Sequence, residues 1–69
     1  MKSRLRLLRA EREWTQEHLA TATGVSRQAI NALETERHDP SLDLAYRIAA
    51  AFRLPVEQVF PNPHERNPS

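Results

Sequence analysis

The apolar positions of this 69-residue chain recur three or four residues apart, which is the spacing of one face of an α-helix. Nowhere do β-branched and aromatic residues alternate with polar ones over the length of a strand. The pattern therefore predicts an all-α fold, a compact bundle of five helices. We expect helices over residues 2–12, 16–23 and 27–35, a fourth after Ser41, and a short fifth beginning near Pro55.

The same spacing predicts the core. Each expected helix has apolar residues on one side, and these should meet in one interior: Leu5, Leu8, Leu19, Ile30, Leu33, Leu44, Ala45, Ile48, Ala49 and Phe52. Thr15, Ser26 and Ser41 precede three of the helices, where a hydroxyl oxygen can accept a hydrogen bond from the first turn. Leu7 lies off the apolar face of the first helix, and we expect it to be exposed.

The last nine residues, PNPHERNPS, contain three of the five prolines and no apolar residue apart from them. We expect a folded domain over residues 1–61 and a flexible tail over residues 62–69. No apolar run approaches the roughly 18–20 residues that span a membrane, and the first residues lack the apolar region of a signal peptide. Together with the absence of cysteine, this composition suits a cytoplasmic protein.

The residues that catalysis or metal binding would need are scattered. His18, His38 and His64 lack the spacing of metal ligands, and Gly24 is the only glycine, so there is no glycine-rich phosphate-binding loop. We therefore expect no enzyme, no metal site and no cofactor. The net charge of +1 argues against a nonspecific nucleic-acid coat. Basic residues nevertheless crowd the first twelve positions, where they could form a local patch: Lys2, Arg4, Arg6, Arg9 and Arg12.

The single glycine lies between the second and third expected helices. Gly24 can adopt the positive φ that a tight turn requires, and we expect one helix to crowd another there. A small residue, Ala20, precedes the turn, and an apolar one, Val25, follows it. Ile30 and Leu33 can then lock the third helix onto the first two. This arrangement is typical of a helix-turn-helix motif.

Three segments, WTQEHLA, GVSRQAINALE and DPSLDLAYRIAAAF, resemble the Cro/repressor family of helix-turn-helix regulators, also called the xenobiotic-response-element family. The resemblance extends from about Arg4 to Phe60 and is strongest to short bacterial members that contain little beyond this domain. It implies a lambda-repressor-like DNA-binding domain of five helices. It also implies sequence-specific binding of double-stranded DNA by a homodimer.

The sequence departs from the family pattern at the ends of three helices. Members often have glycine or asparagine where this chain has Glu13, Glu36 and Arg53. A left-handed backbone at any of these would cost about 1 kcal/mol relative to glycine. Thr23 stands where the family usually has a leucine, which removes apolar volume from the core. These departures concern stability more than function.

In a helix-turn-helix the third helix enters the major groove with its N-terminal residues at the base edges. The exposed positions of that helix are therefore the candidate base contacts: Ser26, Arg27, Gln28, Asn31 and Ala32. Arg27 can donate two hydrogen bonds to guanine, whereas Gln28 or Asn31 can pair with adenine. Ala32 offers only a methyl group, suited to thymine or to no contact. The alternative is an ordinary polar surface.

Phosphate contacts are expected beside the base contacts. The resemblance implies that Gln16 binds a phosphate, aided by the N–H groups and dipole at the start of its helix. Arg37 and Arg6 are further candidates. Arg9 has two alternatives, a phosphate contact or the ion pair with Glu34 that the resemblance implies, and we favour the pair. Such a pair would brace the first helix against the third.

One domain of this size reads few base pairs, whereas a dimer reads two half-sites about one helical turn apart. We expect an isologous interface formed by the fifth helix and its flank: Leu54, Val56, Val59 and Phe60. The alternative for these residues is closure of the monomer core. The sequence thus predicts a dimeric repressor that reads a palindromic operator. The competing prediction is an antitoxin or another protein-interaction module of the same fold, with a toxin or a membrane regulator as its protein partner.

Overall fold

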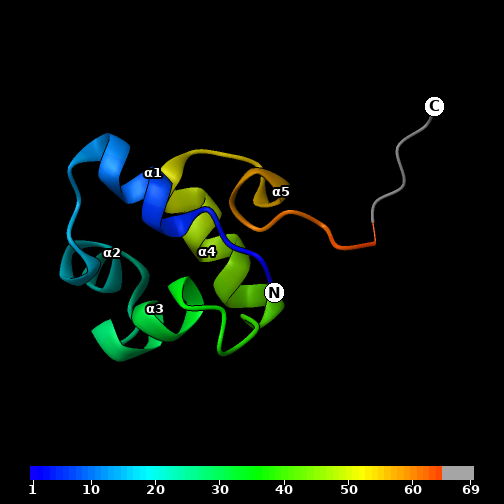
Figure 1. Ribbon diagram of the computed structural model, residues 1–69. Helices are drawn as coiled ribbons and strands as arrows, with labels where there is room; N and C mark the ends of the chain where they lie inside the picture. Colours follow the sequence, from blue (N-terminus) through cyan, green and yellow to red (C-terminus); the bar gives the residue numbers. More distant parts are fainter. Residues whose placement is uncertain (65–69) are drawn as a thin grey trace.

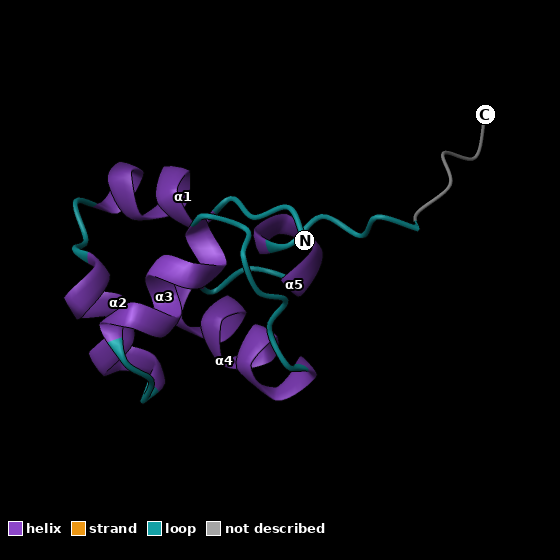
Figure 2. Ribbon diagram, turned by 60° about the horizontal axis from the view of Figure 1, so that its bottom comes forward, coloured by secondary structure: helices purple, strands orange, loops and turns teal. Residues whose placement is uncertain are grey.

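The computed structural model describes residues 1–64, and five α-helices form within them (Figure 1). In chain order they are α1 (Leu5–Arg12), α2 (Gln16–Thr23), α3 (Arg27–Glu34), α4 (Leu42–Phe52) and α5 (Val56–Val59). No strand occurs in the described part of the chain (Figure 2), and the predicted all-α class is confirmed. The final five residues of the predicted tail, 65–69, lie outside the described residues.

A single core lies where one face of every helix meets. Each helix supplies one large side chain with no exposed surface: Leu5, Leu19, Ile30, Ile48 and Val59. Removing such a side chain from water stabilises the fold by about 1.5–3 kcal/mol. α4 lies between α2 and α5 (Figures 1 and 2). The prediction that Leu44 belongs to the core was only partly right, since it packs against the core but stays half-exposed.

Three helices begin as the sequence predicts. The side-chain oxygens of Thr15, Ser26 and Ser41 accept hydrogen bonds from the backbone N–H three residues later, at 2.9 to 3.1 Å. Each bond satisfies one of the N–H groups that a helix leaves unpaired at its start. The caps place the starts of α2, α3 and α4 within one residue of the predicted positions.

The prediction that the first helix begins at Lys2 was wrong. α1 begins at Leu5, after four residues that are not helical and that are held by tertiary contacts. The backbone N–H of Arg4 donates to the carbonyl oxygen of Val59 at 2.9 Å. The hydroxyl of Ser3 accepts from the N–H of Leu5 at 3.0 Å, whereas Arg4, the residue that precedes the helix, makes no side-chain capping bond. No local pattern in the sequence indicated the bond from Arg4 to α5.

Four residues at or near helix ends have left-handed backbones. Gly24 has φ +76°, and Glu13, Glu36 and Arg53 have φ +56°, +61° and +58°. The chain therefore uses ordinary residues at three positions where glycine would be less strained. The expected crowding at Gly24 was wrong: an added Cβ would meet only Arg47 Nη1, at 3.9 Å. Glycine is favoured there by its positive φ and not by lack of space.

Candidate nucleic-acid interface

An open groove of about 480 Å³ lies beside the exposed face of α3. Its lining consists of six residues that the sequence predicted as DNA contacts: Gln16, Arg27, Gln28, Asn31, Ala32 and Arg37. Two guanidinium groups and three amides face this groove, and none of the lining residues is acidic. The groove therefore offers hydrogen-bond donors and positive charge to a ligand that has acceptors and negative charge.

The amphipathic pattern of α3 directs these side chains outward. Ile30 and Leu33 are buried against the other helices, and they fix the rotation of α3 about its axis. Arg27, Gln28 and Asn31 are exposed, and their i, i+1 and i+4 spacing places them on one side of the helix. The burial of two apolar residues thus determines which polar residues face the groove.

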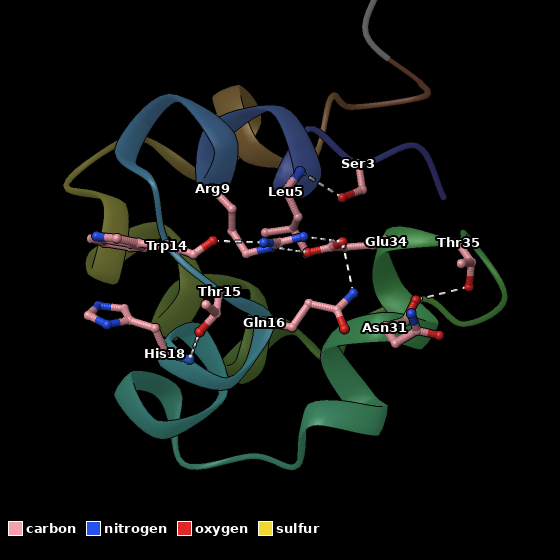
Figure 3. Close-up of polar contacts among 10 residues, drawn as sticks. All are labelled: Ser3, Leu5, Arg9, Trp14, Thr15, Gln16, His18, Asn31, Glu34 and Thr35. Carbon is pink, nitrogen blue, oxygen red and sulfur yellow. Dashed lines mark hydrogen bonds and ion pairs between the residues drawn. The ribbon is translucent and has the colours of Figure 1, made fainter.

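Arg9 and Glu34 lie side by side and form an ion pair (Figure 3). The Nε and Nη2 groups of Arg9 each donate to one carboxylate oxygen of Glu34, the second at 2.9 Å. Its Nη1 group donates to the carbonyl oxygen of Trp14 at 2.8 Å. The Glu34 side chain is 3% exposed and that of Arg9 15%. One buried ion pair therefore joins α1, the α1–α2 loop and the end of α3.

The same carboxylate also holds Gln16 at the rim of the groove. Gln16 Nε2 donates to Glu34 Oε1 at 3.1 Å (Figure 3). The amide keeps its second N–H and its carbonyl oxygen for other partners. Sequence reasoning missed this contact because Gln16 and Glu34 are eighteen positions apart, and no periodicity relates them.

Burial and hydrogen bonding oppose each other at Glu34. Burial alone would raise the pKa of its carboxyl, but the hydrogen bonds from Arg9 and Gln16 outweigh that effect, and the pKa lies below its ordinary value. The charge of Arg6 acts in the same direction. The hydrogen bond with Glu34 raises the pKa of Arg9. Both Arg9 and Glu34 are thus charged, and their opposite charges cancel. The positive charge of the groove therefore comes from Arg27 and Arg37.

Two of the predicted DNA contacts lie outside the groove lining. Ser26 is exposed, but its hydroxyl oxygen caps α3 by accepting from the N–H of Ala29 at 3.0 Å. Arg6 is exposed on α1 and lies close enough to Glu34 to affect its carboxyl. The groove lining therefore contains neither Ser26 nor Arg6.

The predicted dimer residues divide into two pairs. Val59 is fully buried within one chain and Phe60 is 6% exposed. These two residues complete the monomer core, which is the alternative that the sequence left open, and they offer almost no surface to a partner. Leu54 and Val56 are only half-buried. They keep apolar surface that a second molecule could cover.

Two large apolar side chains on α4 are exposed, a feature that sequence reasoning missed. Leu42 is 69% exposed and Tyr46 is 56% exposed. Leu7 on α1 is 59% exposed, as expected from its position off the apolar face. Within residues 1–64 no helix is long and apolar enough to cross a membrane. That same stretch brings no three metal-ligating side chains together.

Comparisons with known proteins agree with the geometry. The helix-turn-helix family model HTH_3 matches residues 5–59. An uncharacterized HTH-type transcriptional regulator of Methanocaldococcus jannaschii is 48% identical over 60 residues, which cover 87% of this chain and 91% of the relative. YgzD, an uncharacterized HTH-type transcriptional regulator of Bacillus subtilis, is 42% identical over 60 residues, with the same coverage of both chains.

Two solved structures have similar folds. The hypothetical transcription factor NHTF from Neisseria has a TM-score of 0.76 at 34% identity, covering 90% of this chain and 70% of its own. The N-terminal DNA binding domain of SinR from Bacillus subtilis has a TM-score of 0.76 at 22% identity, covering 90% and 91%. The second likeness concerns the fold alone.

Proposed function

Because this chain belongs to the helix-turn-helix family of the Cro/repressor type, we propose that it is a sequence-specific regulator of transcription. Its ligand is double-stranded DNA, read through the major groove. In this proposal it acts in the cytoplasm on nucleoid DNA, needs no cofactor or metal and catalyses no reaction. It represses by occupying an operator, which keeps polymerase from the same site.

The groove beside α3 is the observation that supports this function. Arg27 can donate two hydrogen bonds to guanine O6 and N7, and Gln28 or Asn31 can pair with adenine N6 and N7. Ala32 is half-buried between them and can contact a thymine methyl group. Ser26 lies at the N-terminal end of the same face. These five residues are the proposed base contacts.

Phosphate contacts are proposed at the rim of the groove. Gln16 is the first residue of α2, so its side chain and the N–H groups at the start of the helix, other than that of His18, which donates to Thr15, can bind a phosphate. Arg37 lies at the other side of the lining, after the end of α3. Arg6 on α1 is the third candidate. Such contacts fix the register of a protein on DNA and supply much of its affinity.

A dimer is proposed because one α3 helix contacts too few base pairs for useful selectivity. Two copies related by a two-fold axis would read a palindromic operator with half-sites about 10 base pairs apart. Leu54 and Val56 are the members of the predicted interface that keep surface for this contact.

An antitoxin or another protein-interaction module of the same fold is the second candidate. The exposed Leu42 and Tyr46 favour it, since exposed apolar patches often mark protein contacts. The polar lining of the α3 groove favours DNA. A toxin or a membrane regulator bound elsewhere on the surface would be compatible with both functions.

Titration of a fluorescent duplex pool of random sequence tests DNA binding. The wild-type protein should bind at low salt, and its affinity should fall steeply as salt rises. Arg37→Ala should weaken binding to the whole pool. Arg53→Ala is the matched control, because Arg53 is an exposed arginine outside the groove lining. Equal effects of the two substitutions would contradict the proposed site.

A further inference from the structure

An aromatic cluster joins the start of α2 to the end of α4. It consists of Arg12, Trp14, His18 and Phe52. The partly buried ring of Trp14 stacks on that of Phe52, the last residue of α4, with 5.0 Å between the ring centres and 21° between the planes. The ring of His18, in the first turn of α2, lies 4.7 Å from that of Trp14 (Figure 3). None of the four residues lines the groove beside α3.

Arg12, the last residue of α1, adds a charge to the aromatic cluster. Its guanidinium carbon lies 5.0 Å from the ring centre of Phe52 and 5.9 Å from that of Trp14, within the roughly 6 Å over which a cation is attracted to an aromatic face. Its Nη2 group donates to the carbonyl oxygen of Phe52 at 3.3 Å, one of the carbonyls that a helix leaves unpaired at its end. The ends of α1 and α4 and the start of α2 thus meet around Trp14.

The backbone of Trp14 is held as firmly as its ring. Its N–H donates to the carbonyl oxygen of Arg9 at 2.9 Å, and its own carbonyl oxygen accepts from Arg9 Nη1 at 2.8 Å. The next two residues are Thr15, which caps α2, and Gln16, whose amide donates to Glu34. Trp14 therefore fixes the point of the chain from which α2 starts.

We propose that Trp14 is a positioning residue for phosphate binding at the start of α2. Glu34 holds the side chain of Gln16, whereas Trp14 holds the backbone from which that side chain extends. The role requires a flat ring, because an aliphatic side chain can fill the same space but cannot stack on Phe52. The inference rests on the proposed function for its phosphate ligand, whereas the hold of Trp14 on α2 can be measured without DNA.

Affinities for duplex DNA test whether Trp14 acts through Gln16. In the wild-type background Gln16→Ala should weaken binding about 10-fold, the effect of losing a hydrogen bond to a charged group. In the Trp14→Leu background the same substitution should weaken binding by less than about two-fold, because the start of α2 is already displaced. Arg27→Ala is the matched control. It should keep its full effect in both backgrounds, since the burial of Ile30 and Leu33 positions α3.

A second substitution separates the ring from its apolar volume. Trp14→Phe keeps a ring that can stack on Phe52, so this variant should bind DNA nearly as tightly as the wild type. Thermal unfolding followed by circular dichroism should show both variants at position 14 folded. The proposal is overturned if Trp14→Phe binds as weakly as Trp14→Leu, or if Gln16→Ala has its full effect in both backgrounds. Equal loss of the Gln16→Ala and Arg27→Ala effects would also overturn it, because it indicates a general distortion.

Amide hydrogen exchange, followed by nuclear magnetic resonance, tests the hold on α2 in the free protein. The N–H of His18 donates to the hydroxyl of Thr15 at 2.9 Å, and the N–H of Ala29 makes the matching bond to Ser26 at 3.0 Å. Trp14→Leu should speed exchange at His18 at least about 10-fold, through local opening of the start of α2, and leave Ala29 unchanged. Unchanged exchange at His18, or equal acceleration at both amides, would overturn the positioning role.

The two measurements separate failure of this inference from failure of the proposed function. A wild-type protein that does not bind duplex DNA would reject the regulator, and hydrogen exchange would still decide whether Trp14 holds α2. Wild-type DNA binding with unchanged exchange at His18 in Trp14→Leu would overturn the inference and leave the regulator intact. Faster exchange at His18 together with loss of the Gln16→Ala effect supports both.

Discussion

The guanidinium of Arg9 and the carboxylate of Glu34 form a buried ion pair that joins two helices across twenty-five positions of the chain. The carboxylate also receives the amide N–H of Gln16. The buried carboxylate of Glu34 is therefore connected to Gln16, which lines the α3 groove. The relative positions of α1, α2 and α3 depend on it.

Removing one member of the pair should leave an uncompensated buried charge. We expect Arg9→Met to lower the free energy of unfolding by about 3 kcal/mol, the lower end for buried pairs, since Arg9 keeps 15% exposure. Urea unfolding followed by the fluorescence of Trp14 measures it. Asp43→Asn is the control, because it breaks an exposed pair and should cost less than about 0.5 kcal/mol. Equal losses would contradict the structural role of Arg9.

The stability should depend on Glu34 in acid. Its pKa is lowered in the folded protein, so its contribution to stability is complete above its ordinary value of 4.5 and is lost as the pH falls through the lower folded value. Glu34→Gln lacks this titration. The difference in unfolding free energy between wild type and variant should therefore shrink as the pH is lowered from about 6 to about 3. A difference that stays constant would show that Glu34 is not held ionised by its partners.

Glycine at the left-handed positions should stabilise the protein. Glu13 and Arg53 are exposed and have φ +56° and +58°. We expect Glu13→Gly and Arg53→Gly each to add about 1 kcal/mol, measured as a higher melting temperature. Gly24→Ala should lose about the same amount although a methyl group has room there. Destabilisation by both glycine variants would mean that the side chains matter more than the backbone strain.

Two substitutions in the α3 groove should separate base from phosphate recognition. Arg27→Ala should cost about 1–3 kcal/mol on the preferred sequence and relax the preference at one base pair. Gln16→Ala should weaken binding to all sequences alike. Affinities for a set of single-base operator variants distinguish these outcomes. An unchanged base preference in Arg27→Ala would mean that α3 does not approach the base edges as proposed.

Local signals in the sequence were sufficient for most of the fold. Apolar spacing and the hydroxyl caps at Thr15, Ser26 and Ser41 located the starts of three helices, and Gly24 marked the turn. Most of the α3 groove could also be predicted, because the spacing of Ile30 and Leu33 fixes which side of α3 is exposed.

Features that depend on packing between distant segments could not be predicted. The non-helical start of the chain is held by the bond from Arg4 to Val59, and the position of Gln16 depends on Glu34. The burial of Val59 and the exposure of Tyr46 are likewise set by how α5 packs on α4. Val59 lies in a helix of four residues, which is too short for spacing alone to assign it to the core or to the surface.

Selection of the purified protein on random duplex DNA is the most direct test of the proposed function. We expect enrichment of a two-fold symmetric motif whose half-sites lie about 10 base pairs apart. The Arg27→Ala protein should enrich a motif with one less defined base pair in each half-site. A pool that stays random after selection at low salt, where DNA binding is strongest, would contradict the account.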